Sequence, residues 1–206
     1  PGYRGQISRD YPTIAEVLHA GGYNTYMSGK WHVTTFGGFD APNGSYPVQR
    51  GFERYYGCLY GGGGYYKPSP VFSNLRRITD FPDDYYYTNA ITDSAVSFIK
   101  GHDPSRPMFL YLAHYAPHLP LQAPERYVQR CLDRYREGYD VLRQRRFEKQ
   151  KKLGLVPADM SLPMFDSEFG GHRPAWTELT PEQQKQWTHD MAIYAAMIEI
   201  MDEGIG

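Results

Sequence analysis

Residues Ser28-Gly29-Lys30-Trp31-His32 end a helix-turn-strand unit near the start of this 206-residue chain and decide its predicted fold. In an extended chain, side chains two residues apart point to the same face, so Lys30 and His32 are predicted to project together, with Trp31 on the other side. Lysine offers a permanent ammonium group, and histidine exchanges a proton near pH 7. Because α/β sheets bind ligands at strand ends, the pair suits an oxyanion such as sulfate or phosphate. The Lys-x-His spacing is common, however, and also occurs at solvated strand ends.

The segment before this stretch has the pattern of a short helix followed by a strand. Thr13 and Glu16 have the spacing of a capping box, in which each side chain binds a free backbone N–H of the first turn. An apolar stripe follows, and Gly21-Gly22 supply a left-handed stop. Residues 23–28 then alternate in the manner of a strand.

The chain repeats this helix-then-strand order between residues 88 and 113. Residues 88–100 form a predicted helix that begins at Thr88. Residues 108–113 are an uninterrupted apolar run, which is typical of a strand buried on both faces of a parallel sheet. Two helix–strand units in succession predict an α/β fold.

His118 comes just after this second predicted strand. Pro117 and Pro120 flank it and restrict the backbone, so its imidazole is expected to have a defined position. A position past the carboxyl end of a parallel strand favours a functional role for His118. His114, at the strand end, is assigned to packing or to support of the site.

Four segments carry a resemblance to a known family. Three of them resemble the second signature of the sulfatases, which are formylglycine-dependent enzymes of the alkaline-phosphatase-like superfamily: Thr13-Ile14-Ala15-Glu16-Val17-Leu18, Ala20-Gly21-Gly22-Tyr23-Asn24-Thr25 and Gly29-Lys30-Trp31-His32. Residues 109–120 resemble the family's strand followed by Pro-His-x-Pro. The resemblance runs over nearly the whole chain and is closest to bacterial arylsulfatases. It implies an α/β fold, as part of an alkaline-phosphatase-like three-layer α/β/α domain with a largely parallel central sheet.

The same resemblance implies an activity and roles for three residues. Sulfatases hydrolyse sulfate esters to inorganic sulfate and an alcohol or phenol, so the expected substrate is a sulfated small molecule or a sulfated carbohydrate. Lys30 is expected to contact the sulfate and the region of the nucleophile, and His32 to orient or deprotonate the formylglycine diol. His118 is expected to contact the sulfate and to protonate the leaving oxygen. The family also makes a periplasmic or secreted location plausible.

Other parts of the family pattern do not occur in this sequence. The chain has no Cys/Ser-x-Pro/Ala-x-Arg motif, from which formylglycine is made, and Cys58 and Cys131 lie in unrelated contexts. The Asp-Asp and Asp-Asn pairs that hold calcium in the family are not identifiable, and Asp83-Asp84 falls in a loop in the wrong order. Residues 1–206 are therefore expected to be a partial catalytic domain truncated at both ends, with no metal ligand assigned in it. Formylglycine is expected upstream and the calcium ligands outside the chain, so the chain by itself is expected to be inactive.

Three other functions stay open: nucleic-acid binding, hydrolysis of phosphoryl or phosphonate esters, and binding without catalysis. The net charge of −1 provides no global field toward nucleic acid or an acidic membrane, and no apolar run has the length of a membrane span. Residues 126–152 carry ten Lys/Arg against four Asp/Glu, which favours a solvated basic face over a nucleic-acid-binding helix. A phosphoryl or phosphonate ester hydrolase of the same superfamily, or a non-catalytic binding relative, would keep a similar scaffold.

The last predicted helix begins at Thr180, followed by proline at the first helical position and Gln183 at the third. Its apolar stripe is predicted to be core, and consists of Trp187, Met191, Tyr194, Ile198 and Met201.

Overall fold

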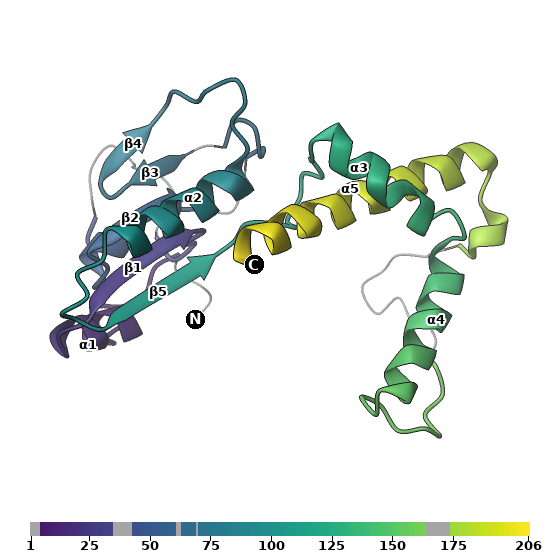
Figure 1. Cartoon of the computed structure of the whole chain (residues 1–206), viewed down its shortest axis with the longest axis horizontal. Coiled ribbons are helices and arrows are strands. Elements are labelled where there is room, and N and C mark those ends of the chain that lie inside the picture. Colours follow the sequence, from purple (N-terminus) through teal and green to yellow (C-terminus); the bar gives the residue numbers. More distant parts are fainter. Residues whose placement is uncertain (1–4, 35–42, 61–62, 69, 164–173) are drawn as a thin grey trace. The chain divides into compact units, whose positions relative to one another are not determined.

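One five-stranded sheet organises the first part of the computed structural model, in the order β4-β3-β2-β1-β5 (Figure 1). The strands are β1 (Asn24–Gly29), β2 (Arg54–Cys58), β3 (Val71–Ser73), β4 (Arg76–Ile78) and β5 (Met108–Ala113). β1 pairs in parallel with both β2 and β5, whereas β3 and β4 add an antiparallel hairpin beside β2. The three parallel strands confirm the predicted α/β class.

The structure describes residues 5–34, 43–60, 63–68, 70–163 and 174–206. They form two compact units. The sheet unit comprises Pro1–Gln122 with Met197–Gly206, and the helical unit comprises Ala123–Ala196.

Helices α1 (Ile14–Ala20) and α2 (Tyr87–Lys100) cover opposite faces of the sheet. Successive side chains of β1 point to opposite faces. Met27 packs with Ala15 of α1, whereas the Ser28 hydroxyl donates a hydrogen bond to the backbone oxygen of Ile91 in α2, at 2.7 Å. Helices therefore lie on both faces of a mostly parallel sheet, as the sequence predicts.

The core on the α1 face is largely aromatic. Tyr55 is fully buried, and the ring of Tyr46 meets that of Phe72 edge-on, with centroids 5.5 Å apart. This face also holds the 3-10 turn Pro47–Gln49. The buried members of the cluster are Ala15, Met27, Tyr46, Phe52, Tyr55, Leu59 and Phe72.

The predicted helix ends are largely confirmed. Thr13 and Glu16 form both hydrogen bonds of the capping box, and Gly22 takes the left-handed conformation after α1. The second helix begins at Tyr87 rather than at Thr88. The Thr88 side chain lies inside the helix and is buried, so it is not the cap.

β5 is not buried on both faces, so that prediction is wrong. It lies at the edge of the sheet, where β1 is its partner among the described strands, and Tyr111 is 47% exposed. An apolar run shows that a strand can be buried on both faces, but it does not predict which strand lies at the edge of the sheet.

The helical unit contains α3 (Glu125–Cys131), α4 (Tyr139–Lys152) and most of α5 (Pro181–Ile205), with 3-10 turns at Leu132–Arg134 and Trp176–Glu178. Gly138, with φ of 86°, separates α3 from α4. The Thr180–Gln183 hydrogen bonds confirm the predicted start of α5. None of the described helices combines the length and apolar character that crossing a membrane requires.

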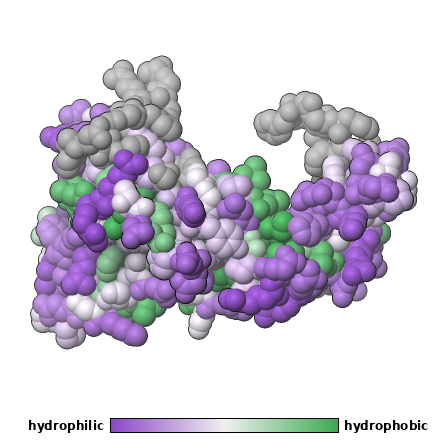
Figure 2. Space-filling view, turned by 90° about the horizontal axis from the view of Figure 1, so that it is seen from above, coloured by the Kyte–Doolittle hydropathy of each residue, from purple (hydrophilic) through white to green (hydrophobic). Residues whose placement is uncertain are grey.

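The surfaces of α4 and α5 differ in character from each other. Of the fourteen described residues of α4, Phe147 alone is buried, which fits a solvated basic face, and hydrophilic residues cover much of the molecular surface (Figure 2). α5 packs on α3 through small residues, Ala192 and Ala196. The predicted core stripe of α5 is wrong for four of its residues, which are 37–40% exposed: Trp187, Met191, Tyr194 and Ile198.

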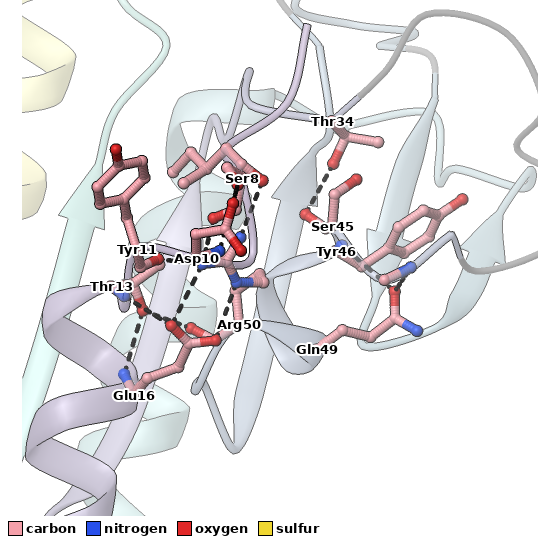
Figure 3. Close-up of polar contacts among 12 residues, drawn as sticks. Ser8, Asp10, Tyr11, Thr13, Glu16, Thr34, Ser45, Tyr46, Gln49 and Arg50 are labelled. Carbon is pink, nitrogen blue, oxygen red and sulfur yellow. Dashed lines mark hydrogen bonds and ion pairs between the residues drawn. The ribbon is translucent and has the colours of Figure 1, made fainter.

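Arg50 fixes the segment that leads into α1 (Figure 3). Its side chain is buried, and its guanidinium donates to Glu16 at 2.9 Å, to the oxygen of Ile7 at 3.1 Å and to that of Tyr11 at 2.8 Å. The hydrogen bond from Arg50 also lowers the pKa of Glu16. In return, the Thr13 hydroxyl donates to the backbone oxygen of Arg50 at 2.8 Å. One side chain therefore connects the chain before α1 to the segment before β2.

Replacing Arg50 with methionine should lower the free energy of unfolding by about 3 kcal/mol, because Glu16 and the backbone oxygens of Ile7 and Tyr11 then lose the buried donor that joins them. Urea denaturation measures this change. The matched control is Arg136→Met, which breaks an exposed pair with Asp133 and should change the free energy by less than about 0.5 kcal/mol. Equal effects of the two substitutions would show that Arg50 does not have this role.

Candidate active site

The backbone beyond β1 is hydrogen-bonded to both neighbouring strands. The N–H of Lys30 donates to the oxygen of Ala113 in β5 at 2.8 Å, whereas that of His32 donates to the oxygen of Leu59 after β2, also at 2.8 Å. Between them, the N–H of Trp31 donates to Cys58 of β2 at 2.9 Å. Lys30 and His32 therefore leave the sheet from a backbone held on two sides, at the carboxyl ends of the parallel strands, where α/β folds bind ligands.

Two glycines allow the strands to approach each other at this point. Gly29 has φ of +125°, and a Cβ placed there would lie 1.8 Å from the oxygen of Ala113. A Cβ at Gly57 would lie 1.8 Å from the oxygen of Gly29. Both contacts are impossible for a side chain, so glycine is required at Gly29 and Gly57.

Lys30 and His32 lie near each other, although not through simple strand alternation. His32 has φ of 60°, so the extended geometry ends before it. The Trp31 side chain packs against the core on the α1 face, where its ring meets Phe52 edge-on and its Nε1 donates to the oxygen of Ser45. Burial lowers the pKa of His32, and electrostatic interactions with Lys30 and His118 lower it further, so the imidazole is predominantly neutral at pH 7.

Tyr115 contacts two of the predicted site residues, Lys30 and His118. The ammonium of Lys30 lies 5.5 Å from the centre of the Tyr115 ring. The His118 ring stacks on the same tyrosine, with centroids 4.9 Å apart and an interplanar angle of 24°. The structure therefore brings Lys30, His32 and His118 together. The sequence analysis missed Tyr115. Its place three residues before His118 was a usable signal, because this spacing allows a turn. In the structure, the His118 N–H donates to the backbone oxygen of Tyr115 and closes that turn.

The groups beneath the site are held neutral by burial. Burial raises the pKa of Tyr65 and Tyr87 and raises that of Cys58 to about 11, so the Cys58 thiol stays protonated at neutral pH and is a poor nucleophile. His114 also lies beside the site, with both ring nitrogens buried and without a hydrogen-bond partner among the described residues, and burial lowers its pKa. It is thus a neutral residue packed near the end of β5.

The described residues do not fit a metal ion. They contain no group of three or more His, Cys, Asp or Glu side chains that could hold one. Asp83 and Asp84, which the sequence analysis rejected as a metal pair, are exposed. The chemistry available to this part of the chain is therefore anion binding by Lys30 and proton exchange by the two histidines.

Comparisons with known proteins agree on one family. The sequence profile described as Sulfatase matches residues 1–206. The whole chain aligns, at 34% identity, with an uncharacterized sulfatase of Schizosaccharomyces pombe and with the arylsulfatase of Klebsiella aerogenes. It spans 38% and 44% of the length of these curated relatives.

Solved structures agree with this result. All of the chain superposes on 47% of BT4656, solved in complex with its substrate D-glucosamine-2-N,6-O-disulfate, with a TM-score of 0.58 and 19% identity. The putative sulfatase YidJ from Bacteroides fragilis gives a TM-score of 0.60 at 19% identity, over 97% of this chain and 39% of that one. These likenesses show an alkaline-phosphatase-like fold.

Replacing Lys30 with methionine should raise the pKa of His32, because the substitution removes a nearby positive charge that opposes protonation of the imidazole. An NMR titration of the His32 ring measures this shift. The matched control is Lys100→Met at the carboxyl end of α2, which precedes the amino end of β5 and lies away from the site. An unchanged His32 pKa in Lys30→Met would mean that the two side chains do not interact.

Proposed function

Because the chain belongs to the sulfatase family, we propose that the complete protein hydrolyses sulfate esters to inorganic sulfate and an alcohol or phenol. Residues 1–206 would form part of its catalytic domain. The observation that carries the proposal is the meeting of Lys30, His32 and His118 past the carboxyl ends of β1 and β5. One permanent cation and two histidines suit a sulfate ester, because the sulfate oxygens carry negative charge and the departing alcohol or phenol oxygen takes up a proton.

Lys30 is proposed to bind the sulfate. Its ammonium group compensates negative charge on the transferred group, and no described carboxylate forms an ion pair with it. Neutral His32 can accept a proton from an attacking oxygen or orient it by a hydrogen bond. Its lowered pKa favours the form that accepts.

His118 is proposed to contact the sulfate and to protonate the leaving oxygen. Its Nδ1 lies 2.6 Å from the backbone oxygen of Leu119 and 3.0 Å from the Tyr115 hydroxyl. With Nδ1 engaged in this way, Nε2 is the ring nitrogen that can reach a substrate. When His118 carries both protons, Nε2–H is a donor to the oxygen that leaves.

Sulfatases generally use a formylglycine nucleophile and a divalent metal. We propose calcium as the metal of the complete protein, bound by oxygen ligands outside this chain. The described residues supply neither group, so their proposed roles are restricted to binding the substrate, orienting it and moving protons.

The proposed substrate class is sulfated carbohydrates or sulfated small molecules. Support comes from BT4656, which was solved with a sulfated glucosamine as its substrate. A direct test is to assay the complete protein with an aryl sulfate and with the corresponding aryl phosphate. Preference for the phosphate would favour a phosphoryl ester hydrolase, and turnover of neither substrate would favour a non-catalytic relative.

Lys30→Ala in the complete protein should lower kcat/KM for an aryl sulfate by about a hundredfold or more, the scale for loss of one preorganised charged donor. Steady-state kinetics measure the loss. Lys100→Ala removes an equal charge outside the site and should leave the rate within about twofold, as expected for a surface substitution. Near-normal turnover by a correctly folded Lys30→Ala protein would contradict the role of Lys30.

His118→Gln should slow esters of weakly acidic phenols more than esters of strongly acidic ones, because a poor leaving group needs the proton more. Rates over a series of substituted aryl sulfates reveal the difference as a steeper dependence on the pKa of the phenol. If the loss is the same for every phenol, His118 binds sulfate without donating a proton.

A further inference from the structure

We propose that Tyr115 is a positioning residue of this site, whose ring holds Lys30 and His118 and whose hydroxyl group helps select the tautomer of His118. The tautomer and the side-chain positions are properties of the folded chain. Their effect on catalysis rests on the proposed sulfatase function.

The ring of Tyr115 is shared by the side chains of Lys30 and His118. Aromatic faces attract cations, and the Lys30 ammonium lies 5.5 Å from the ring centre. The His118 imidazole stacks against the same ring, with centroids 4.9 Å apart. The ring is therefore a shared surface that limits the rotamers of both side chains.

The hydroxyl group of Tyr115 forms a triangle with His118 and Leu119. It lies 2.8 Å from the backbone oxygen of Leu119 and 3.0 Å from Nδ1 of His118, and Nδ1 lies 2.6 Å from the same backbone oxygen. A backbone oxygen can only accept hydrogen bonds, so both the hydroxyl and Nδ1 must present hydrogens to it. Neutral His118 is therefore assigned the Nδ1–H tautomer, which leaves the lone pair on Nε2.

Tyr115 itself is held firmly enough to act as this support. It is 4% exposed, and its ring contacts Tyr65 at 5.2 Å and Tyr87 at 6.0 Å. The Tyr65 hydroxyl also donates to the backbone oxygen of His118 at 2.8 Å, which fixes the turn from a second side. Burial raises the pKa of Tyr115, so its hydroxyl keeps the proton that it donates.

The consequence is that Nε2 is the nitrogen of His118 through which a proton is exchanged with the substrate. With Nδ1 committed to Leu119, Nε2 is available to the sulfate ester, and Lys30 is placed by the same ring. Small errors in such placement are costly, because a displacement of about 1 Å can reduce a rate about a hundredfold.

The test uses two substitutions in the complete protein with ¹⁵N-labelled histidine. Tyr115→Leu removes the ring and the hydroxyl, whereas Tyr115→Phe keeps the ring. Tyr86→Phe is the matched control, because it removes a buried hydroxyl that donates to a backbone oxygen, that of Gln122, without contacting Lys30 or His118. The readouts are the ¹⁵N chemical shifts of the His118 ring and kcat/KM over a series of aryl sulfates.

In wild-type protein the ¹⁵N shifts should show the Nδ1–H tautomer. Tyr115→Leu should mix the two tautomers and lower kcat/KM by about a hundredfold, with the largest losses for poor leaving groups. Tyr115→Phe should shift the tautomer balance slightly and cost about two- to tenfold, as expected for one hydrogen bond. Tyr86→Phe should leave the His118 signals and the leaving-group dependence unchanged.

Several results would overturn the proposal. These are an Nε2–H tautomer in the wild type, His118 signals that do not change in either Tyr115 variant, or a Tyr115→Leu rate equal to that of Tyr86→Phe. If Tyr115→Leu does not fold, unchanged His118 signals in Tyr115→Phe would be sufficient to reject the role of the hydroxyl. Absence of sulfate ester hydrolysis in the wild type, with the predicted change in tautomer still observed, would reject the proposed function but retain the positioning role.

Discussion

The candidate site depends on a point where three strands meet without side chains between them. At Gly29 and Gly57 a Cβ would collide with the backbone of the next strand, at Ala113 or at Gly29 itself. This close approach lets the backbone of Lys30 and His32 bond to β5 and to the chain after β2. The two side chains are therefore positioned by the sheet rather than by a free loop, and positions on rigid elements are the more precise ones.

The two ends of the parallel strands differ in how their polar groups are satisfied. At the amino ends, Arg106 donates to the oxygens of Gly22 and Tyr23 and to Glu53, which also accepts from Asn24. These hydrogen bonds join polar groups of the chain to one another. At the carboxyl ends, Lys30 lies over an aromatic ring, and no described carboxylate pairs with it. We therefore propose an external anion as the partner of Lys30 at this end.

Burial controls the charge of the groups around the proposed anion site. It raises the pKa of the surrounding tyrosines and of Cys58, and it lowers the pKa of His32 and His114. All of these groups are thereby favoured in their neutral forms near pH 7, so Lys30 supplies the fixed positive charge. Such a division between one permanent cation and neutral proton carriers suits transfer of a group that is itself negatively charged.

The sequence by itself determined the features that depend on neighbours along the chain. The capping box at Thr13, the α/β class, and the positions of Lys30 and His118 after strands follow from local pairing, periodicity and proline restraint. The tertiary structure decided which surfaces meet. It placed β5 at the edge, left much of the apolar stripe of α5 half exposed, and brought Tyr115 against both Lys30 and His118. These outcomes depend on contacts between distant segments, and a residue's own neighbours in sequence do not contain that information.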